Sequence, residues 1–370
     1  MRSEMEMICP LRGGHITVEA VGPGHPDKVC DQISDAVLDA ALADDPHSRV
    51  AIETTGKGRI KLIGEMTTSS VLDLRELTLR VHREIGYRDD EVDGVDIDVV
   101  QQSGDIAMGT NDEVQGAGDQ GIMVGYAVNT PEYEYMPIAY ALAQKLVARL
   151  DEARQAGTLP FLRPDNKSQV VMRDGQVVRV TIATQHTADV ELGELRGAVY
   201  REVIVPVVGD VDFANCQING TGRFVNGSFA ADAGLTGRKI VVDQYGPWVP
   251  VGGGAFSGKD PSKVDRTAAY MARLIAKTIV ADGMAEEALV HLAYTIGYTE
   301  PDSVGVRVFK PRDPDLDFET WIRENFPLSP GAMIKRLGLT TPSGWSYQQT
   351  AMYGHFGHTE FPWEQVNKIG

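Results

Sequence analysis

The sequence contains few cysteines, and no two of them lie close together. Among its 370 residues are only Cys9, Cys30 and Cys216, and there is no C-x-x-C motif. This set excludes a zinc site built on paired cysteines and is typical of a protein kept in a reducing compartment. No apolar run approaches 18 residues, and the first ten residues lack an apolar core. We therefore expect a cytoplasmic protein with neither a transmembrane helix nor a signal peptide.

Basic residues are also scarce relative to acidic ones. The chain has 35 Lys and Arg against 52 Asp and Glu, which gives a net charge of −17. Such a balance argues against nucleic acid or an anionic membrane as the partner. Apolar residues make up 42% and charged residues 24%, which is typical of a globular protein, and the length predicts two or three domains.

A repeated order of elements runs along the chain: a long helix, a strand hairpin and a second helix. The hairpins begin near residues 49, 168 and 289, about 120 residues apart. The predicted helices are 26–43, 71–85, 136–155, 190–203, 262–281 and 316–325, and the predicted hairpin strands are 49–54, 60–66, 168–173, 176–184, 289–297 and 303–309. We therefore predict an α+β fold of three similar units, each a small antiparallel-rich sheet covered by helices.

Glycine and positive charge gather in one segment, residues 220–266. Ten of the 39 glycines lie between Gly220 and Gly258, and the segment carries a local charge of +2 in an acidic chain. Glycines let backbone N–H groups approach an anion, and lysine and arginine neutralise its charge. This pattern favours a polyphosphate site, and a flexible loop with ordinary lysines is the alternative.

Two glycine motifs resemble nucleotide-binding loops without the expected context. Residues 253–260 nearly match a P-loop, but an aspartate replaces the hydroxyl residue and the preceding stretch has two prolines. Residues 116–121 match G-x-G-x-x-G, but a polar loop precedes them and a short strand-like run follows. We therefore predict neither a P-loop nor a dinucleotide-binding fold. Asp119, inside the second motif, is either a ligand-binding acid or an ordinary turn residue.

The stretch GHPDK at 24–28 opens the first predicted helix. Pro26 suits the first helical position, so His25 and Asp27 lie at a helix N-terminus, where anions are favoured. His25 could donate to a phosphate ester and Asp27 could bind a metal; a simple capping turn is the alternative. Glu53 and Glu65 lie at strand ends of the first hairpin. Gln102 begins a long loop of the kind that often forms a functional lid.

These motifs together resemble one family, the S-adenosylmethionine synthetases, also called methionine adenosyltransferases. The resemblance rests on GHPDKVCDQISDAVLDA at 24–40, GAGDQG at 116–121 and GGGAFSGKDPSKVDR at 252–266. Shorter matches lie at 163–170, 221–225, 234–242 and 353–357, and the whole is collinear from about residue 18 to 364.

The resemblance implies a reaction and an architecture. The sulfur of methionine attacks C5′ of ATP and displaces triphosphate, which is then hydrolysed to pyrophosphate and phosphate. Three similar α+β domains would surround a pseudo-threefold axis, and we place them at residues 14–108, 114–225 and 226–364. The resemblance also implies a homodimer with shared active sites, possibly paired into a tetramer, and the use of two Mg²⁺ ions per site and of K⁺.

Residues that match the family's motifs take their expected roles from it. His25 would donate to the oxygen that leaves C5′, Asp27 and Asp265 would bind Mg²⁺, and Glu53 would lie by the K⁺ site. Methionine would be held by Glu65, Gln102 and Asp119. Phe224 would stack on a substrate ring, with Asp165 and Asp232 positioning the substrate. The triphosphate would be surrounded by Lys167, Arg238, Lys239, Lys259 and Lys263. We expect His25, Lys167, Arg238 and Lys259 to be catalytic.

Some residues depart from the family's pattern, although none of these carries a role assigned above. The departures are Pro23, Gly104, Val251 and the run 228–231. They concern the lid, the K⁺ dependence and the packing of the dimer. A catalytically weak regulatory or assembly subunit of the same family is the alternative, and an unrelated ATP-dependent kinase is disfavoured because kinase motifs are absent.

Overall fold

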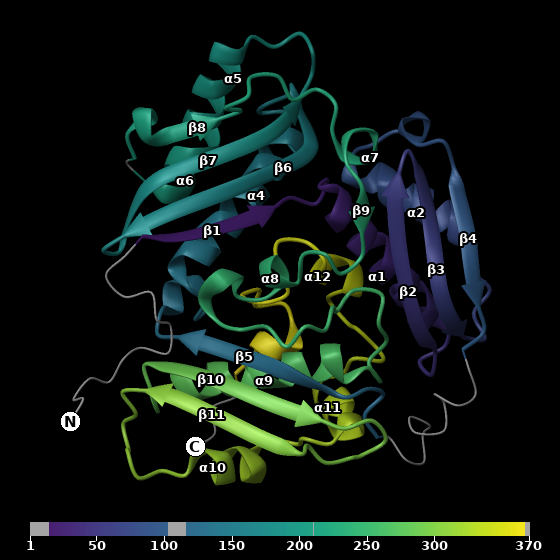
Figure 1. Ribbon diagram of the computed structural model, residues 1–370, viewed down its shortest axis with the longest axis vertical. Helices are drawn as coiled ribbons and strands as arrows, with labels where there is room; N and C mark the ends of the chain where they lie inside the picture. The colour runs from purple at the N-terminus through teal and green to yellow at the C-terminus, as the bar shows by residue number, and fades with distance from the viewer. Residues whose placement is uncertain (1–14, 103–115, 210, 367–370) are drawn as a thin grey trace.

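Three small sheets organise the part of the chain that the computed structural model describes, residues 15–102, 116–209 and 211–366. Each sheet contains one of the predicted hairpins, which confirms the α+β repeat (Figure 1). The hairpins are β2–β3 (Arg49–Lys57 and Arg59–Thr67), β6–β7 (Leu162–Arg173 and Gln176–His186) and β10–β11 (Glu287–Tyr294 and Ser303–Phe309).

A long helix precedes each hairpin and a shorter helix follows it. The long helices are α1 (Pro26–Asp44), α4 (Ile138–Gln155) and α9 (Val264–Ala281). The following helices are α2 (Leu74–Ile85), α5 (Leu192–Val199) and α10 (Phe318–Asn325). Further short helices are α6 (Val205–Val208), α7 (Ser228–Ala231), α8 (Ile240–Asp243), α11 (Pro330–Leu337) and α12 (Tyr347–Thr350). Among these described helices, none is long and apolar enough to cross a bilayer.

The sheets exchange strands in a closed cycle, which the repeat did not predict. A short strand upstream of each long helix pairs with the hairpin of another unit. These strands are β1 (Ile16–Val21), antiparallel to β6; β5 (Gly121–Val128), antiparallel to β10; and β9 (Gly234–Leu235), antiparallel to β2. In Figure 1 the purple β1 lies beside the teal β6, and the blue β5 beside the green β10. Backbone hydrogen bonds therefore join each unit to the other two.

Two sheets gain a parallel fourth strand. β4 (Val95–Val100) lies beside β3, and β8 (Cys216–Ile218) lies beside β7. The chain before β8 corrects one prediction, because the helix expected over 190–203 is interrupted by a π-helical turn, Tyr200–Ile204. Pro206 has no N–H to donate to the carbonyl of Glu202. That carbonyl accepts instead from Nε of Arg149, at 3.0 Å.

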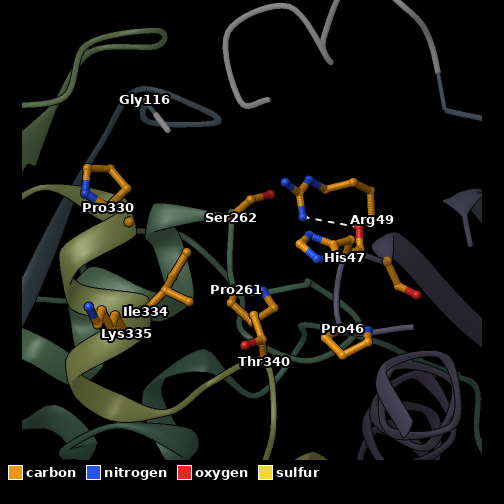
Figure 2. Close-up of a pocket in the computed structure, with 12 residues that line it drawn as sticks. Pro46, His47, Arg49, Gly116, Pro261, Ser262, Pro330, Ile334, Lys335 and Thr340 are labelled. Atoms are coloured by element: carbon orange, nitrogen blue, oxygen red, sulfur yellow. Dashed lines mark hydrogen bonds between the residues drawn. The ribbon is translucent and has the colours of Figure 1, made fainter. Parts of the chain in front are cut away.

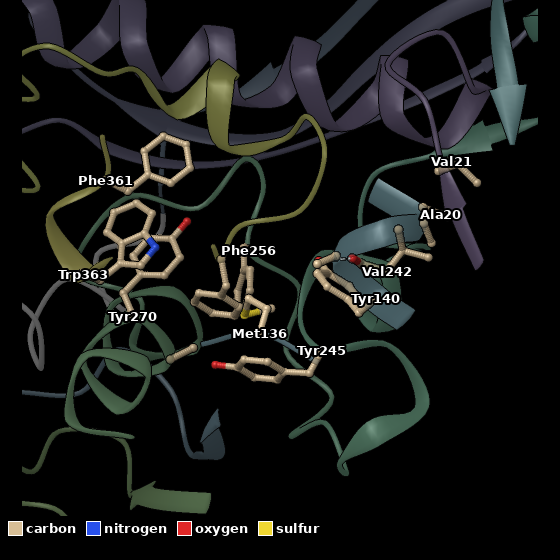
Figure 3. Close-up of a cluster of buried hydrophobic side chains, with 14 of the residues drawn as sticks. Ala20, Val21, Met136, Tyr140, Val242, Tyr245, Phe256, Tyr270, Phe361 and Trp363 are labelled. Carbon is tan, nitrogen blue, oxygen red and sulfur yellow. Dashed lines mark hydrogen bonds between the residues drawn. The ribbon is translucent and has the colours of Figure 1, made fainter. Parts of the chain in front are cut away.

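The core around α9 is dense and aromatic. Sixteen of the 18 residues of α9 are buried, so this helix is enclosed on all sides. The ring of Tyr270 stacks on Trp363 with centroids 3.6 Å apart (Figure 3). The ring of Tyr245 stacks on Phe356 with centroids 4.9 Å apart. The C-terminal segment thus covers α9 and closes the molecule around it.

Candidate active site

His25 caps the first long helix, as the GHPDK motif predicts. Its Nδ1 accepts the backbone N–H of Asp27 at 3.2 Å, and Pro26 follows at the first helical position. The residue is 2% exposed. Burial, with the nearby charges of Lys239 and Lys167, lowers the pKa of His25 to about 2. The ring is therefore neutral and carries its proton on Nε2, which is left to donate.

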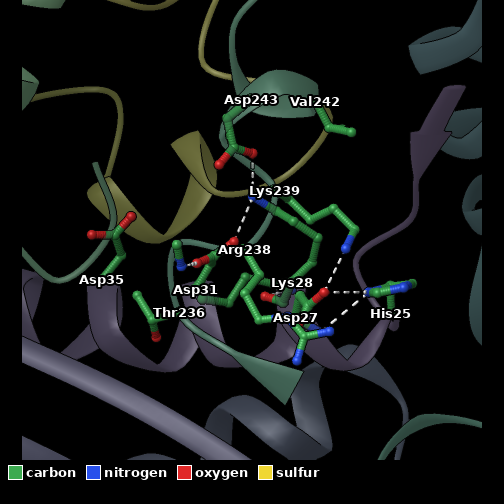
Figure 4. A network of polar contacts seen from close by, with 12 residues as sticks. His25, Asp27, Lys28, Asp31, Asp35, Thr236, Arg238, Lys239, Val242 and Asp243 are labelled. Atoms are coloured by element: carbon green, nitrogen blue, oxygen red, sulfur yellow. Dashed lines mark hydrogen bonds and ion pairs between the residues drawn. The ribbon is translucent and has the colours of Figure 1, made fainter. Parts of the chain in front are cut away.

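Asp27 brings the glycine-rich segment to this helix end. Its carboxylate is buried and accepts the backbone N–H of Leu235 at 3.0 Å. The same carboxylate pairs with Nζ of Lys239 and, at 3.3 Å, with Nε of Arg238 (Figure 4). Two cations from residues 220–266 thus lie beside the His25 ring, although about 200 residues separate them from it in the sequence.

The second sheet supplies further charge to the same place. Lys167 on β6 pairs in register with Val21 of β1 and acts electrostatically on His25. Burial raises the pKa of Asp165 to about 6, while its Oδ2 accepts the N–H of Ser228 at 2.8 Å. The departure at 228–231 thus forms helix α7 and holds Asp165. Asp232, just after α7, is exposed and raises the pKa of both His25 and Asp165.

Phe224 is linked to this region through the next residue, Val225, which shares Gln185 with Asp165. Gln185 accepts the N–H of Asp165 at 3.4 Å and donates to the carbonyl of Val225 at 2.9 Å. The eight residues that the structure brings together here are termed the His25 group: His25, Asp27, Asp165, Lys167, Phe224, Asp232, Arg238 and Lys239.

A second set of predicted residues gathers elsewhere. Nζ of Lys259 lies 2.6 Å from Oδ2 of Asp265, at the first turn of α9, and Nζ of Lys263 lies 2.9 Å from Asp260. A backbone bridge pairs Lys259 with Ala51 of β2, and Ala51 pairs in register with Glu65 of β3. Glu53 is exposed, two residues beyond Ala51 on β2. We term Glu53, Glu65, Lys259, Lys263 and Asp265 the Lys259 group.

The remaining predicted residues lie on the chain next to the Lys259 group. Asp119 is exposed and precedes Gly121, where an added Cβ would lie 3.4 Å from Oδ1 of Asp265. Gln102 is half-buried, two residues beyond Val100, which pairs with Glu65. Residues 103–115 of the predicted lid, with Gly104, lie outside the described residues.

A cavity of about 360 Å³ opens between β2 and α11, near the Lys259 group (Figure 2). Its lining includes the guanidinium-bearing Arg49 on one side and the apolar Pro330 and Ile334 of α11 on the other. Pro261 and Ser262, which follow the glycine loop 253–260, also line the cavity.

The glycine loop 253–260 is preceded by a single 3₁₀ turn, Gly246–Trp248, and not by a strand. Likewise β5, and not a helix, begins at Gly121. The motif at 253–260 is therefore not a P-loop, and the motif at 116–121 is not a dinucleotide-binding loop.

The His25 group and the Lys259 group are held by different aspartates of helix α1, at separate points along the helix. Asp27 holds Lys239, whereas Asp35, eight residues further along α1, accepts the N–H of Gly258 at 2.9 Å. At about 1.5 Å per residue, these anchors stand about 12 Å apart along the helix. Each chain thus presents two separate clusters of cations and carboxylates.

Three sequence models of a single family match consecutive parts of the chain. They describe the N-terminal domain of S-adenosylmethionine synthetase at residues 14–107, its central domain at 114–224 and its C-terminal domain at 226–365. The chain belongs to the S-adenosylmethionine synthetase family. This conclusion agrees with the three-unit fold.

Curated relatives match over nearly their full length. A protein named S-adenosylmethionine synthase from Clostridium tetani (strain Massachusetts / E88) is 46% identical over 384 residues, covering 95% of this chain and 97% of its own. The protein of the same name from Mycobacterium leprae (strain Br4923) is 46% identical over 398 residues, covering 97% and 98%.

Members of the S-adenosylmethionine synthetase family use metal ions, and both groups contain carboxylates, the kind of ligand that Mg²⁺ prefers. Within the described residues, no three His, Cys, Asp or Glu side chains form a ready metal cage. Asp27 and Asp265 instead each hold a lysine. This fits Mg²⁺, which is usually bound by one or two carboxylates together with substrate phosphates.

The sequence motifs did not single out a row of aspartates on α1. Asp31, Asp35 and Asp39 continue a four-residue spacing from Asp27, and the first two are fully buried. Buried carboxylates need hydrogen-bond or ion-pair partners, so such a row marks contacts with other segments. The repeated spacing within GHPDKVCDQISDAVLDA was the available signal.

Proposed function

We propose that this chain is a methionine adenosyltransferase that forms S-adenosylmethionine from ATP and L-methionine. The sulfur attacks C5′, the C5′–oxygen bond breaks, and the displaced triphosphate is hydrolysed to pyrophosphate and phosphate. The observation that carries this proposal is the neutral, buried His25 beside Lys167, Arg238 and Lys239. The His25 ring is a hydrogen-bond donor surrounded by cations, and such a site suits an anionic leaving group such as triphosphate.

His25 acts through hydrogen bonding in this proposal. Its pKa of about 2 means that it holds no extra proton to give up near neutral pH. The Nε2–H instead stabilises the negative charge that develops on the oxygen leaving C5′. The sulfur nucleophile is neutral and needs no base, so orientation and charge stabilisation account for the chemistry.

The cations share the triphosphate. Lys167, Arg238 and Lys239 bind it from the His25 group, and Lys259 and Lys263 bind it from the Lys259 group. Asp27 and Asp265 would each hold Mg²⁺, and Glu53 would lie by K⁺. These ions neutralise phosphate charge when bound. Lys239 and Lys259, which pair with these carboxylates here, would bind phosphate when the carboxylates hold Mg²⁺.

The remaining residues bind methionine and position the rest of the substrate. Glu65, Gln102 and Asp119 hold methionine, with the exposed Asp119 carboxylate on its ammonium group. Phe224 stacks on a substrate ring, and Asp165 and Asp232 position the substrate.

The assembly proposed is a homodimer, possibly paired into a tetramer. The His25 group and the Lys259 group are anchored apart on one chain, and in a dimer the His25 group of one chain would meet the Lys259 group of the other. The three domains are proposed to span residues 14–108, 114–225 and 226–364. The chain keeps the complete set of expected cations, which argues against the alternative of a catalytically weak regulatory or assembly subunit. The cytoplasmic location stays a prediction from composition.

The test uses the purified full chain with ATP, methionine, Mg²⁺ and K⁺. We expect S-adenosylmethionine, pyrophosphate and phosphate in equal amounts, no turnover without Mg²⁺, and reduced turnover when a bulky organic cation replaces K⁺. Phosphate without S-adenosylmethionine, or no product, would contradict the proposal.

A further inference from the structure

One row of aspartates on α1 binds backbone amides from three distant segments. The row is Asp27, Asp31, Asp35 and Asp39, spaced four residues apart. Their amide partners are Leu235, Gly237, Gly258, and the pair Tyr347 and Gln348, respectively. Bonds from an N–H to a carboxylate are shorter and stronger than neutral ones. Helix α1 therefore holds the backbone of all three segments in place.

Asp31 fixes the peptide that precedes the two cations of the His25 group. Its Oδ1 accepts the N–H of Gly237 at 2.9 Å, and Arg238 and Lys239 follow directly. Its other oxygen lies 3.0 Å from Nζ of Lys28, which also binds Asp243 at 2.5 Å (Figure 4). Asp31 is 0% exposed, so it cannot touch a substrate itself.

Asp35 does the same for the Lys259 group. Its Oδ1 accepts the N–H of Gly258 at 2.9 Å, and Lys259 follows directly. Arg266 forks onto both oxygens of Asp35, at 2.6 and 2.9 Å, and donates to the carbonyl of Lys259 at 3.2 Å. The two-residue segment Gly258–Lys259 is thus held at its first N–H and at its last carbonyl.

We propose that Asp31 and Asp35 are positioning residues for the transferase reaction. Each binds the N–H of the glycine just before a triphosphate cation, and so sets where the backbone of that cation stands. The proposal rests on the function proposed above, which assigns those cations to the triphosphate. A misplacement of about 1 Å at a reacting centre can cost about 10²-fold in rate.

Asp31 allows the clearer experiment. Asp31→Asn keeps an oxygen that can accept from Gly237 and leaves Lys28 paired one to one with Asp243. Asp31→Ala removes the acceptor. Asp39→Ala is the matched control, because it removes two backbone acceptors from the same helix, but those amides belong to α12 and not to the cationic segments. The kcat and the KM for ATP, the hydrolysis of added triphosphate, and the melting temperature are measured for all three.

We expect Asp31→Ala to lose about 10- to 100-fold in kcat for both reactions. Asp31→Asn should recover to within a few-fold of wild type at the same pH. Asp39→Ala should melt earlier and keep its kcat. Should Asp31→Ala not be recovered folded, Asp31→Ser, whose hydroxyl lies one bond nearer the helix, takes its place with the same expectation.

Three results would overturn the positioning role: an unchanged kcat in Asp31→Ala or its serine replacement, no recovery in Asp31→Asn, or an equal loss of kcat in Asp39→Ala. These outcomes are judged only against an active wild type. An inactive wild type would instead contradict the proposed function, so the two failures are distinguishable.

Discussion

The His25 ring shows how one residue is prepared by its surroundings. A backbone N–H at the start of α1 occupies Nδ1, while burial and two lysines keep the ring neutral. A histidine at an ordinary surface position would be partly protonated near its pKa of 6.5. The local helix start therefore decides which nitrogen is free to donate.

The pKa of His25 predicts a dependence of folding stability on pH. The folded state holds this ring neutral down to about pH 2, whereas the unfolded chain protonates it below pH 6.5. Stability contributed by the neutral ring is therefore lost as the pH falls below 6.5. From pH 6 to pH 5, wild type should lose about 1 kcal/mol more than His25→Asn, whose amide can still cap the helix.

Urea unfolding of the two proteins at both pH values measures this difference directly. The comparison isolates His25, because the other buried histidines are common to both proteins. Parallel loss of stability in wild type and variant would show that His25 is protonated in the folded state.

Two residues of the His25 group are expected to separate the two chemical steps. His25→Asn should lose S-adenosylmethionine formation by about 10²–10³-fold, the usual loss for one preorganised donor, and still hydrolyse added triphosphate. Arg238→Leu should form S-adenosylmethionine in one turnover and then stall with triphosphate bound. Single-turnover assays with labelled ATP report both steps. Equal loss of both steps in both variants would refute this division.

At the scale of elements, the exchanged strands depend on close backbone contact. β5 crosses α9 at Gly125, where an added Cβ would lie 1.9 Å from the carbonyl oxygen of Ala272. Only glycine lets the strand and the helix approach this closely. The contact holds β5 against α9 while β5 pairs with β10.

Replacing Gly125 with alanine should therefore force β5 from α9. Overpacking of this kind costs about 1–3 kcal/mol or more in free energy of unfolding. Gly193→Ala is the matched control, since an added Cβ at this second residue of α5 meets nothing within 4 Å. Thermal unfolding should show a lower melting temperature for Gly125→Ala and little change for Gly193→Ala, and a Gly125→Ala protein as stable as wild type would contradict the contact.

At the scale of the whole molecule, the two separated groups predict active sites shared between chains. A variant that lacks His25 and one that lacks Lys259 damage different halves of each site. In a mixed dimer, one site then combines both damaged halves and the other is intact.

Mixing His25→Asn with Lys259→Ala should thus restore S-adenosylmethionine formation. Random pairing into symmetric dimers predicts about a quarter of wild-type activity, after exchange of subunits by dilution and reconcentration. Each variant incubated alone is the control. Light scattering should show a dimer or a tetramer, and a lack of restored activity in proven mixed dimers would contradict the shared site.

The sequence by itself determined the elements and the motifs of this protein. Apolar spacing and turn glycines predicted the long helices and all three hairpins, because these signals are local to each element. The start of α1 was predicted at Pro26, and the motifs 24–40 and 252–266 identified the residues that form the two groups.

Only the tertiary structure decided how these parts combine. The antiparallel pairing of β1 with β6 and of β5 with β10 joins segments more than 100 residues apart, and no local periodicity specifies a partner for a strand edge. The aspartates of α1 were visible as a spacing, but their amide partners at Gly237 and Gly258 exist only once the chain has folded. Long-range backbone pairing therefore decided which cations stand beside His25 and which stand apart.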